Sequence, residues 1–426
     1  MFFQRRQYLV RFPFLTFLVG MSLSCHKVEV ASSNNGNLKF YGGGLDDVPT
    51  AAIQTSDGGF AITGYTNRNL NDDMFLLKLD HNGNQQWFRT YGGPNDDVGN
   101  ALVQTADGGY LVTGSTNSFG KAIKNNSTAL DVYAVRTNPN GDTIWTKTYG
   151  YQTPGFGTYG NDYANAVCND PDGTHYIGGY TGNNYINDSV WPSSLVVKIK
   201  DNGQVIWSKP YNPGNSNTYN YNYAPFLTEM VVDKNDHIIL GSYTDSFIIN
   251  KISPNGTKLW SARTRFQTNS GYLIGIVNNL AQKSDGSYSF LATGTNPFGN
   301  VEVLIDAINV SFDGNIITRM PIDSFTAVDI IACSTQLANG DFIVAASLMA
   351  KAGSPVYDIG TSIGGFKLLR FDNTGKTTFI KTLDGWPLAI FPDNQGNYFI
   401  VGYNNKYAST RTEIFTEWVD SKGVTR

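Results

Sequence analysis

The sequence is poor in charge and in the residue types that most often carry catalysis. Asp, Glu, Lys and Arg make up 15% of its 426 residues, whereas an average globular domain has about 25%. The formal net charge is −4 and no long basic run occurs, so the chain lacks the electrostatic signature of nucleic-acid binding. It has four histidines and no HExxH, GxSxG or CxxC motif. The sequence therefore offers no signature of metal or nucleophilic catalysis.

Long hydrophobic runs are also lacking. The most apolar stretch, Phe12 to Leu23, has twelve residues, and a membrane-spanning helix needs about 20. Arg5, Arg6 and Arg11 precede it and Ser24 follows it. Basic residues, a short apolar run and a small residue in this order are typical of a secretory signal. We therefore expect an exported protein without a permanent transmembrane helix.

Cys25 directly follows this signal. The segment Ser22-Leu23-Ser24-Cys25 resembles a bacterial lipobox, although an aliphatic residue is more usual at the first of these positions. The resemblance implies that Cys25 is lipidated and anchors the mature chain in the bacterial cell envelope, where we expect the outer membrane. The alternative is an ordinary signal peptide followed by a chance cysteine. The expected plan is a signal peptide over 1–24, the lipidated cysteine with a polar flexible tether over 25–37, and a folded domain over 38–426.

The other two cysteines, Cys168 and Cys333, lie in apolar stretches of different repeats. Their separation in the repeat order is too large for disulfide geometry. We predict two buried free thiols, and no disulfide framework that holds the fold.

The rest of the chain is a set of repeats. The segment AAIQTSDGGFAITG at 51–64 returns as ALVQTADGGYLVTG at 101–114. Each unit has two Asp/Asn-Gly-type turns between apolar strands, which predict two-residue hairpins with positive φ. The first series is Gly58, Gly108, Gly173, Gly286, Gly340 and Gly396, with Asn235-Asp236 in the fourth unit; the second is Gly83, Gly141, Gly203, Gly256, Gly314, Gly375 and Gly423.

These series predict seven units with a period of about 57 residues, which is typical of four-stranded propeller blades. In the first unit we expect strands over 51–54, 60–65, 74–80 and 86–91. The seventh unit has expected strands over 388–391, 398–403 and 413–419, and the sequence stops at Arg426 before a full fourth strand. Leu38 to Gly42 (LKFYG) matches the end of a fourth strand. The predicted fold is therefore an all-β, seven-bladed β-propeller, closed by an N-terminal strand that completes the last blade.

The blade connections predict two unlike faces. The tight-turn face carries the glycine turns, which join the first strand to the second and the third to the fourth. The long-loop face carries the other connections, and the long insertions fall there, at 115–130, 149–163, 181–194, 211–224 and 347–364. Insertions confined to one face indicate a binding face. We predict ligand contacts from aromatic residues of these loops, which suit sugar rings or peptides: Tyr159, Tyr185, Trp191, Tyr219, Tyr221 and Tyr223.

A tryptophan follows the second glycine turn in four units, as Trp87, Trp145, Trp207 and Trp260. This pattern resembles the tryptophan-docking repeat of pyrroloquinoline-quinone-like (PQQ-like) propellers, the fold of quinoprotein dehydrogenases. Similar repeats occur in Bacteroidetes-type exported lipoproteins. The resemblance covers about 38–423 and is clearest in the first three units. It implies that the four tryptophans dock neighbouring blades and have a structural role.

The expected function is binding or scaffolding by a non-enzymatic envelope lipoprotein, with the membrane as one partner and a glycan, peptide or protein as ligand. We expect no cofactor, because no motif assigns the catalytic carboxylate of a quinoprotein dehydrogenase. Repeated acid pairs, Asp46-Asp47 and Asp96-Asp97, either cap turns or supply oxygen ligands to calcium. The alternatives are a carbohydrate-active propeller enzyme, which needs two suitably spaced carboxylates, or a PQQ-dependent dehydrogenase.

Overall fold

The computed structural model places thirty β-strands and no α-helix in the residues that it describes. Those residues are 38–42, 46–67, 71–120, 129–151, 160–182, 185–186, 189–190, 193–211, 226–243, 246–264, 274–295, 302–326, 329–337, 339–348, 365–372, 376–404 and 412–424. Within these ranges no helix is long and apolar enough to cross a membrane. The signal peptide, Cys25 and the tether of the sequence analysis lie outside them.

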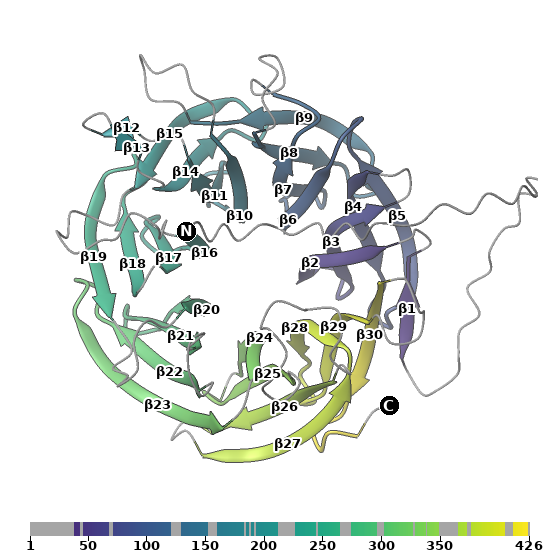
Figure 1. Cartoon of the computed structure of the whole chain (residues 1–426), viewed down its shortest axis with the longest axis vertical. Coiled ribbons are helices and arrows are strands. Elements are labelled where there is room, and N and C mark those ends of the chain that lie inside the picture. Colours follow the sequence, from purple (N-terminus) through teal and green to yellow (C-terminus); the bar gives the residue numbers. More distant parts are fainter. Residues whose placement is uncertain are drawn as a thin grey trace, which may run out of the picture.

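Twenty-eight of the strands form seven antiparallel four-stranded sheets, which are arranged in a ring like the blades of a propeller (Figure 1). The predicted all-β, seven-bladed propeller is thereby confirmed. Blade 1 consists of β2(Asp47–Gln54), β3(Phe60–Asn67), β4(Asp72–Leu79) and β5(Gln85–Tyr91). Blade 2 consists of β6(Asp97–Gln104), β7(Tyr110–Thr116), β8(Asp131–Thr137) and β9(Thr143–Tyr149). Blade 3 consists of β10(Asp162–Asn169), β11(His175–Thr181), β14(Ser193–Ile199) and β15(Val205–Tyr211). Blades 4 and 5 are β16(Phe226–Val232), β17(Ile238–Tyr243), β18(Phe247–Ile252), β19(Lys258–Thr264); and β20(Ile274–Gln282), β21(Tyr288–Thr295), β22(Glu302–Val310), β23(Ile316–Thr326). Blades 6 and 7 are β24(Asp329–Gln336), β25(Phe342–Leu348), β26(Gly365–Phe371), β27(Thr377–Asp384); and β28(Trp386–Pro392), β29(Tyr398–Asn404), β30(Glu413–Val419), β1(Lys39–Tyr41).

The inner strands of blades 1 and 7 are longer than predicted, and the inner strand of every blade is bulged. In blade 1 it begins at Asp47 rather than Ala51, and its register with β3 shifts between Pro49 and Ala51. Five other inner strands shift across one residue in the same way, and the inner strand of blade 5 shifts between Asn278 and Ala281. Side chains at the bulges reach the next blade: Thr50 donates to Gly99 O (2.5 Å), Asn100 to Ala164 O (2.9 Å), Asn165 to Leu227 O (3.3 Å) and Thr228 to Val277 O (3.1 Å). Because polar residues stand at the bulge, this part of the strand has no apolar pattern in the sequence.

The glycine turns differ from the predicted two-residue hairpins. In the first turn Thr55 N donates to Gly59 O (2.8 Å), and Gly58 N donates to Thr55 O (2.9 Å). Only the glycine has positive φ (78°), so the hairpin is a type I turn closed by one left-handed residue. In the fourth blade Asp236 takes this conformation, with φ of 62°.

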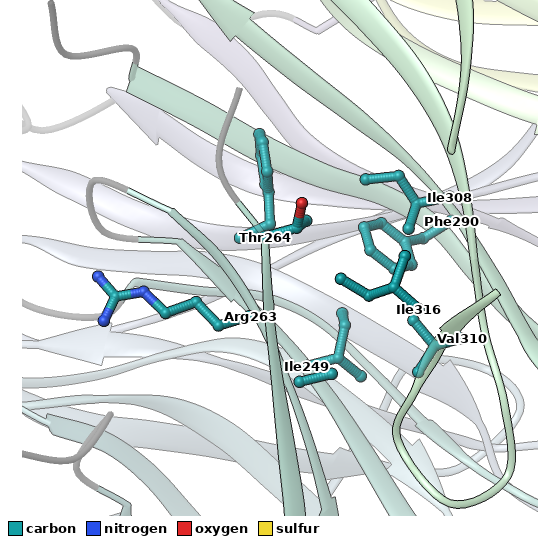
Figure 2. A pocket seen from close by; sticks show the side chains of 9 residues that line it. Ile249, Arg263, Thr264, Phe290, Ile308, Val310 and Ile316 are labelled. Atoms are coloured by element: carbon teal, nitrogen blue, oxygen red, sulfur yellow. The ribbon is translucent and has the colours of Figure 1, made fainter. Parts of the chain in front are cut away.

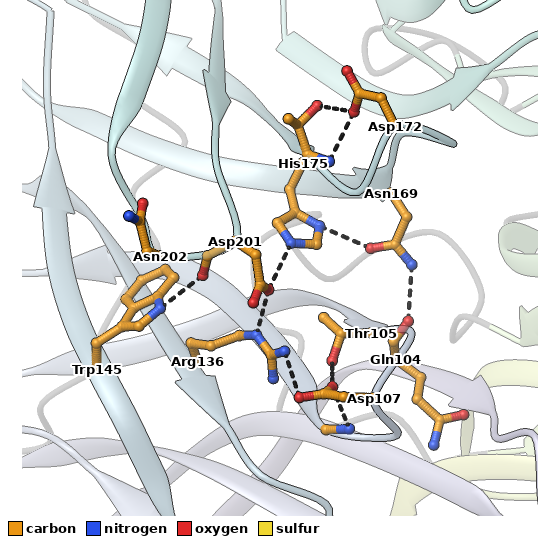
Figure 3. Close-up of polar contacts among 12 residues, drawn as sticks. Gln104, Thr105, Asp107, Arg136, Trp145, Asn169, Asp172, His175, Asp201 and Asn202 are labelled. Carbon is orange, nitrogen blue, oxygen red and sulfur yellow. Dashed lines mark hydrogen bonds and ion pairs between the residues drawn. The ribbon is translucent and has the colours of Figure 1, made fainter.

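Buried cations tie the turns of the tight-turn face together. Arg136, only 2% exposed, donates to Asp107 of its own blade (2.9 Å) and to Asp201 in a turn of blade 3 (2.8 Å), as Figure 3 shows. His175 lies in the same network, between Asn169 (3.0 Å) and Asp201 (3.1 Å). Equivalent ion pairs join Lys78 to Asp57, Lys198 to Asp170, Lys251 to Asp233 and Arg370 to Asp341. Arg370 is half-buried and the other four cations are buried. These contacts are structural, because a buried cation must keep a carboxylate partner.

The outer strand of a blade docks on the third-to-fourth turn of the next blade. The indole of Trp145 donates to Asp201 O (2.9 Å), that of Trp207 to Pro254 O (3.1 Å) and that of Trp260 to Phe312 O (2.8 Å). Trp87 meets Tyr110 of the next blade edge-on, at 5.9 Å between ring centroids. Each indole therefore covers the seam between two sheets.

A tyrosine ends the outer strand of four blades and adds a second hydrogen bond across the seam. Tyr91 donates to Gly141 O (2.7 Å), Tyr149 to Gly203 O (2.9 Å) and Tyr211 to Gly256 O (2.9 Å), while Tyr41 donates to Gly83 O. All four side chains are 6–8% exposed. We refer to these positions as the seam tyrosines.

β1 lies in blade 7 at the place that the fourth strand takes in the other blades. It pairs antiparallel with β30, with Lys39 opposite Thr416 and Tyr41 opposite Ile414 (Figure 1). It also makes the contacts of an outer strand, since Lys39 donates to Asn82 O of blade 1 (2.7 Å) and Tyr41 is a seam tyrosine. Strand β1 therefore contacts the first and the last blade at once.

The two remaining cysteines are free, as predicted. Cys333 is buried in an apolar cluster of blades 6 and 7, and Cys168 is half-buried. Burial raises the pKa of both thiols above the ordinary range, so neither has the thiolate character of a reactive cysteine.

Trp87→Ala tests the docking of the outer strands. The half-buried indole packs between blades 1 and 2, so we expect a loss of about 2–4 kcal/mol in the free energy of unfolding. The matched control is Gln86→Ala, which changes the exposed neighbour and should cost less than about 0.5 kcal/mol. Urea unfolding followed by circular dichroism measures both; equal stabilities would contradict the docking role.

Candidate functional site

The candidate site is the long-loop face. The predicted insertions connect β7 to β8, β9 to β10, β11 to β14, β15 to β16 and β25 to β26, so all of them belong to this face. Of the six predicted ligand residues, Tyr159, Trp191, Tyr219, Tyr221 and Tyr223 lie outside the described residues. Tyr185 begins the two-residue strand β12(Tyr185–Ile186), which pairs with β13(Ser189–Val190), and its side chain is not described. Their ligand-binding role stays a prediction.

Aromatic pairs stand at the long-loop ends of the inner two strands. In blade 3, Tyr163 of β10 and Tyr180 of β11 are stacked at 4.9 Å between centroids and 16° between planes. In blade 7, Trp386 of β28 and Tyr403 of β29 are stacked at 6.4 Å and 12°. The register gives the two pairs equivalent positions, and all four side chains are half-buried. They leave partly exposed rings on a rigid sheet, which suits contact with an apolar or sugar surface.

Tyr65 of blade 1 occupies the same position as Tyr180 and Tyr403. Burial and the neighbouring Asp72, Tyr403 and Asp46 raise its pKa to about 12, so the hydroxyl is a neutral donor at physiological pH. We call Tyr65, Tyr163, Tyr180, Trp386 and Tyr403 the aromatic rim. None of the five is among the six ligand residues predicted from the sequence, because they belong to strands rather than to the long loops.

The acid pairs lie beside this rim, and their first members clamp neighbouring blades. Asp96 Oδ1 accepts the backbone N–H of Asp72 (3.1 Å), and Asp46 Oδ1 accepts that of Thr412 (2.9 Å). In blade 3, Asn161 Oδ1 accepts the backbone N–H of Leu130 (3.0 Å) in the same way. The side chain at this position therefore fixes the start of the third strand of the preceding blade.

The second members cap the loop that enters the blade. Asp97 Oδ2 accepts the backbone N–H of Gly93 (2.7 Å) and the hydroxyl of Ser118 (2.8 Å). Asp162 Oδ2 accepts the backbone N–H of Tyr151 (2.9 Å). Of the two roles considered for these acids, turn capping is the one that the contacts display. No group of three or more His, Cys, Asp or Glu that could hold a metal ion occurs among the described residues.

Close packing of carboxylates makes the junction of blades 7, 1 and 2 electrostatically strained. Burial, followed by the charges of Asp96, Asp46 and Asp73, raises the pKa of Asp72 to about 6. Burial also raises the pKa of Asp73 and of Asp97. The rim thus combines aromatic faces with hydrogen-bond acceptors that carry negative charge at neutral pH, a combination that fits hydroxyl groups, amides or cationic groups of a ligand.

Comparisons with known proteins assign the chain to no family. No family model and no curated protein matches its sequence. Among solved structures, the Neurospora crassa Pan2 WD40 domain is similar over 87% of this chain and 88% of that chain, at 11% identity and a TM-score of 0.48. YCF48 bound to D1 peptide is similar over 90% and 95%, at 9% and 0.47. A Bacteroides caccae protein of unknown function is similar over 69% and 87%, at 11% and 0.37.

Asp72→Asn tests the charge strain at the rim. A carboxyl whose pKa is raised in the folded state binds its proton more tightly there than in the unfolded chain. The free energy of unfolding of the wild type therefore falls as pH rises from about 4 to 6, and the contribution of Asp72 stays constant above pH 6. Asparagine cannot ionise and keeps the acceptor for Asn67 (3.2 Å). We expect the variant to be more stable than the wild type by about 1–3 kcal/mol at pH 7.5 and equal to it near pH 3.5.

Asp80→Asn is the control, and its expected effect on stability at pH 7.5 is opposite to that of Asp72→Asn. Slight burial opposes the shift, but hydrogen bonds from Asn84 and Asn82 lower the pKa of Asp80. The stability that this carboxylate contributes is therefore present above about pH 4, and its loss should destabilise the protein at pH 7.5. Urea unfolding at pH 3.5 and 7.5 measures both variants. If Asp72→Asn is less stable than the wild type at pH 7.5, the proposed charge repulsion around Asp72 is refuted.

Proposed function

We propose that the protein is a binding or scaffold module of the bacterial cell envelope, which holds a glycan, peptide or protein on its long-loop face. The observation that carries this proposal is the aromatic rim. Five half-buried rings stand at equivalent strand ends, next to carboxylates whose backbone contacts keep them in place. Rigid aromatic side chains bury a large area at a low cost in conformational entropy, which is why binding surfaces use them.

The scaffold beneath the rim supports the same proposal. Neighbouring blades are joined at the bulges, at the acid pairs and at the seam tyrosines. At the seams between blades 1 and 2 and between blades 2 and 3, contacts on all three levels resist relative motion of the blades. A rigid platform under long insertions is the usual arrangement of a binding face.

The proposed lipid on Cys25 fits the orientation of β1. This strand is antiparallel to β30, which runs from the long-loop face to the tight-turn face, so Lys39 lies toward the tight-turn face. Thirteen residues from Cys25 to Asn37 reach at most about 45 Å when extended. A tether that joins the propeller on the tight-turn face would leave the long-loop face open to a ligand.

Trp386→Ala tests the aromatic rim. The variant and wild type are screened on an array of bacterial polysaccharide fragments and on a peptide library, and affinities for the hits are measured by surface plasmon resonance. We expect about tenfold weaker binding, since a central aromatic contact is worth 1–2 kcal/mol or more.

The matched control is Trp418→Ala, which removes a half-buried tryptophan of the same blade that packs on Phe399 (5.1 Å). This change should lower stability and leave affinity unaltered. A joint replacement of Tyr219, Tyr221 and Tyr223 by Ala tests the loop prediction in parallel. If Trp386→Ala and the triple variant both keep full affinity for every hit, the long-loop face is not the binding face. Cleavage of a polysaccharide hit would favour the carbohydrate-active alternative.

Cys25→Ala tests the anchor. Cells that express the full chain are fed an alkyne-labelled fatty acid, and the protein is examined by mass spectrometry and by membrane fractionation. We expect label and membrane association in the wild type and neither in the variant, because the proposed lipid is attached through this thiol. Cys168→Ala is the control and should retain the label. Unlabelled wild type would refute the lipid anchor without affecting the ligand proposal.

A further inference from the structure

Aromatic rings and carboxylates alternate along the long-loop ends of blades 7, 1 and 2. Asp46 joins blade 1 to blade 7 and Asp96 joins blade 2 to blade 1, each by accepting a backbone N–H of the preceding blade. Burial raises the pKa of Tyr65, and Asp72 and Tyr403 are among the groups close enough to raise it further. We call the following residues the acid–aromatic arc: Trp386, Tyr403, Asp46, Tyr65, Asp72 and Asp96.

The charge of the two joining carboxylates is not needed for the contacts that they make within the fold. In blade 3 the equivalent residue is Asn161, whose Oδ1 accepts the backbone N–H of Leu130 (3.0 Å). An amide oxygen therefore holds a neighbouring blade there as Asp46 and Asp96 do. The two aspartates thus place negative charge at half-buried positions where an uncharged side chain would serve the structure equally well.

No cation offsets this charge within the part of the chain that the structure describes. Asp46, Asp72 and Asp96 take part in no ion pair there, and burial and the neighbouring carboxylates raise the pKa of Asp72 without an opposing cation. On the tight-turn face, by contrast, buried cations pair with aspartates of the turns, as Lys78 does with Asp57 (2.9 Å). The fold thus supplies cations to acids of one face and leaves the arc available to a cation from outside.

The rings of the arc suit the same kind of ligand. Trp386 and Tyr403 are stacked at 6.4 Å between centroids and 12° between planes, and they are half-buried, as is Tyr65. The face of an aromatic ring attracts ammonium and guanidinium groups, most strongly in tryptophan. A carboxylate beside the ring adds a charge-assisted hydrogen bond. Rings and carboxylates together therefore favour a cationic group over the hydroxyl groups of a neutral sugar.

The apolar seam between blades 4 and 5, in contrast, is filled by its own side chains (Figure 2). Ile249, Phe290 and Ile308 are 1–2% exposed and belong to one packed core cluster. A ligand could enter this seam only by displacing core side chains, which is costly. The half-buried rings and charges of the arc need no such displacement.

We propose that the acid–aromatic arc binds a basic peptide segment. Ammonium or guanidinium groups of the segment lie over the rings of Trp386 and Tyr65 and beside the carboxylates of Asp46 and Asp96. Because these carboxylates stand at two neighbouring seams, the segment carries at least two basic side chains. This inference rests on the proposed function, since it names the class of ligand that the long-loop face holds.

Hexalysine titrated into the full chain by isothermal calorimetry tests the proposal, with hexalysine acetylated at Nζ as the neutral control peptide. The test variant combines Asp46→Asn with Asp96→Asn and keeps both backbone contacts, as Asn161 does in blade 3. We expect this variant to bind hexalysine at least about tenfold more weakly than the wild type does. The acetylated peptide should not bind, and wild-type affinity for hexalysine should fall as salt rises from about 0.05 to 0.5 M.

The matched control combines Asp142→Asn with Asp313→Asn, two exposed aspartates in turns of the tight-turn face. Both double variants change the net charge equally, so a general attraction between opposite charges weakens equally in the two. We expect the control to bind hexalysine within about twofold of the wild type. An equal loss of affinity in both double variants would overturn the proposal, and so would full affinity in the Asp46→Asn, Asp96→Asn variant.

The screen described for Trp386→Ala separates failure of this proposal from failure of the proposed function. If only neutral or acidic ligands bind and their binding depends on Trp386, the long-loop face is a binding face but the basic peptide is wrong. If a glucosamine hexamer binds and hexalysine does not bind at about 1 mM, the ligand is an amino-sugar polymer and the peptide proposal likewise fails. If no ligand depends on the long-loop face, both proposals fail.

Discussion

The structure depends on the contact between the outer strand of one blade and a glycine turn of the next. The turn glycine has positive φ and lies against the docking side chains: a Cβ atom on Gly141 would stand 2.8 Å from the ring of Trp87. A side chain at this point would therefore be strained by the backbone and would push the blades apart. Because only a connecting loop links one blade covalently to the next, this contact sets both the spacing of the blades and the stiffness of the platform above them.

Much of the architecture follows from the sequence because the repeat has to satisfy that contact in each unit. Tight turns, apolar strands and the tryptophan recur at fixed distances, and they were sufficient to predict seven blades of four strands. The inner strands were the exception. Their first residues, such as Asp47 and Thr50, are polar, and Thr50 bonds to the neighbouring blade. The apolar pattern therefore begins several residues after the strand has begun. The turn type was also mispredicted, since a single left-handed glycine satisfies a type I hairpin with one bulged residue.

The candidate site was less accessible to sequence reasoning. Aromatic residues in long loops attract notice, whereas Tyr65, Tyr163, Trp386 and Tyr403 look like ordinary strand residues in the sequence. Only the register of the inner two strands shows that they occupy two facing positions at the long-loop end of their blades.

The position of β1 has a consequence for how the molecule is made. Tyr41 and Thr416 form a hydrogen bond across 375 residues of sequence, so the strand that leaves the ribosome first has no partner until the last blade exists. Contacts between such distant segments form late, because a long loop must close before they contribute any stability. Blades can assemble in order along the chain, but the ring remains open until synthesis ends. During that interval the unpaired edge of the last blade and the free first strand are the parts of the molecule most exposed to misassembly.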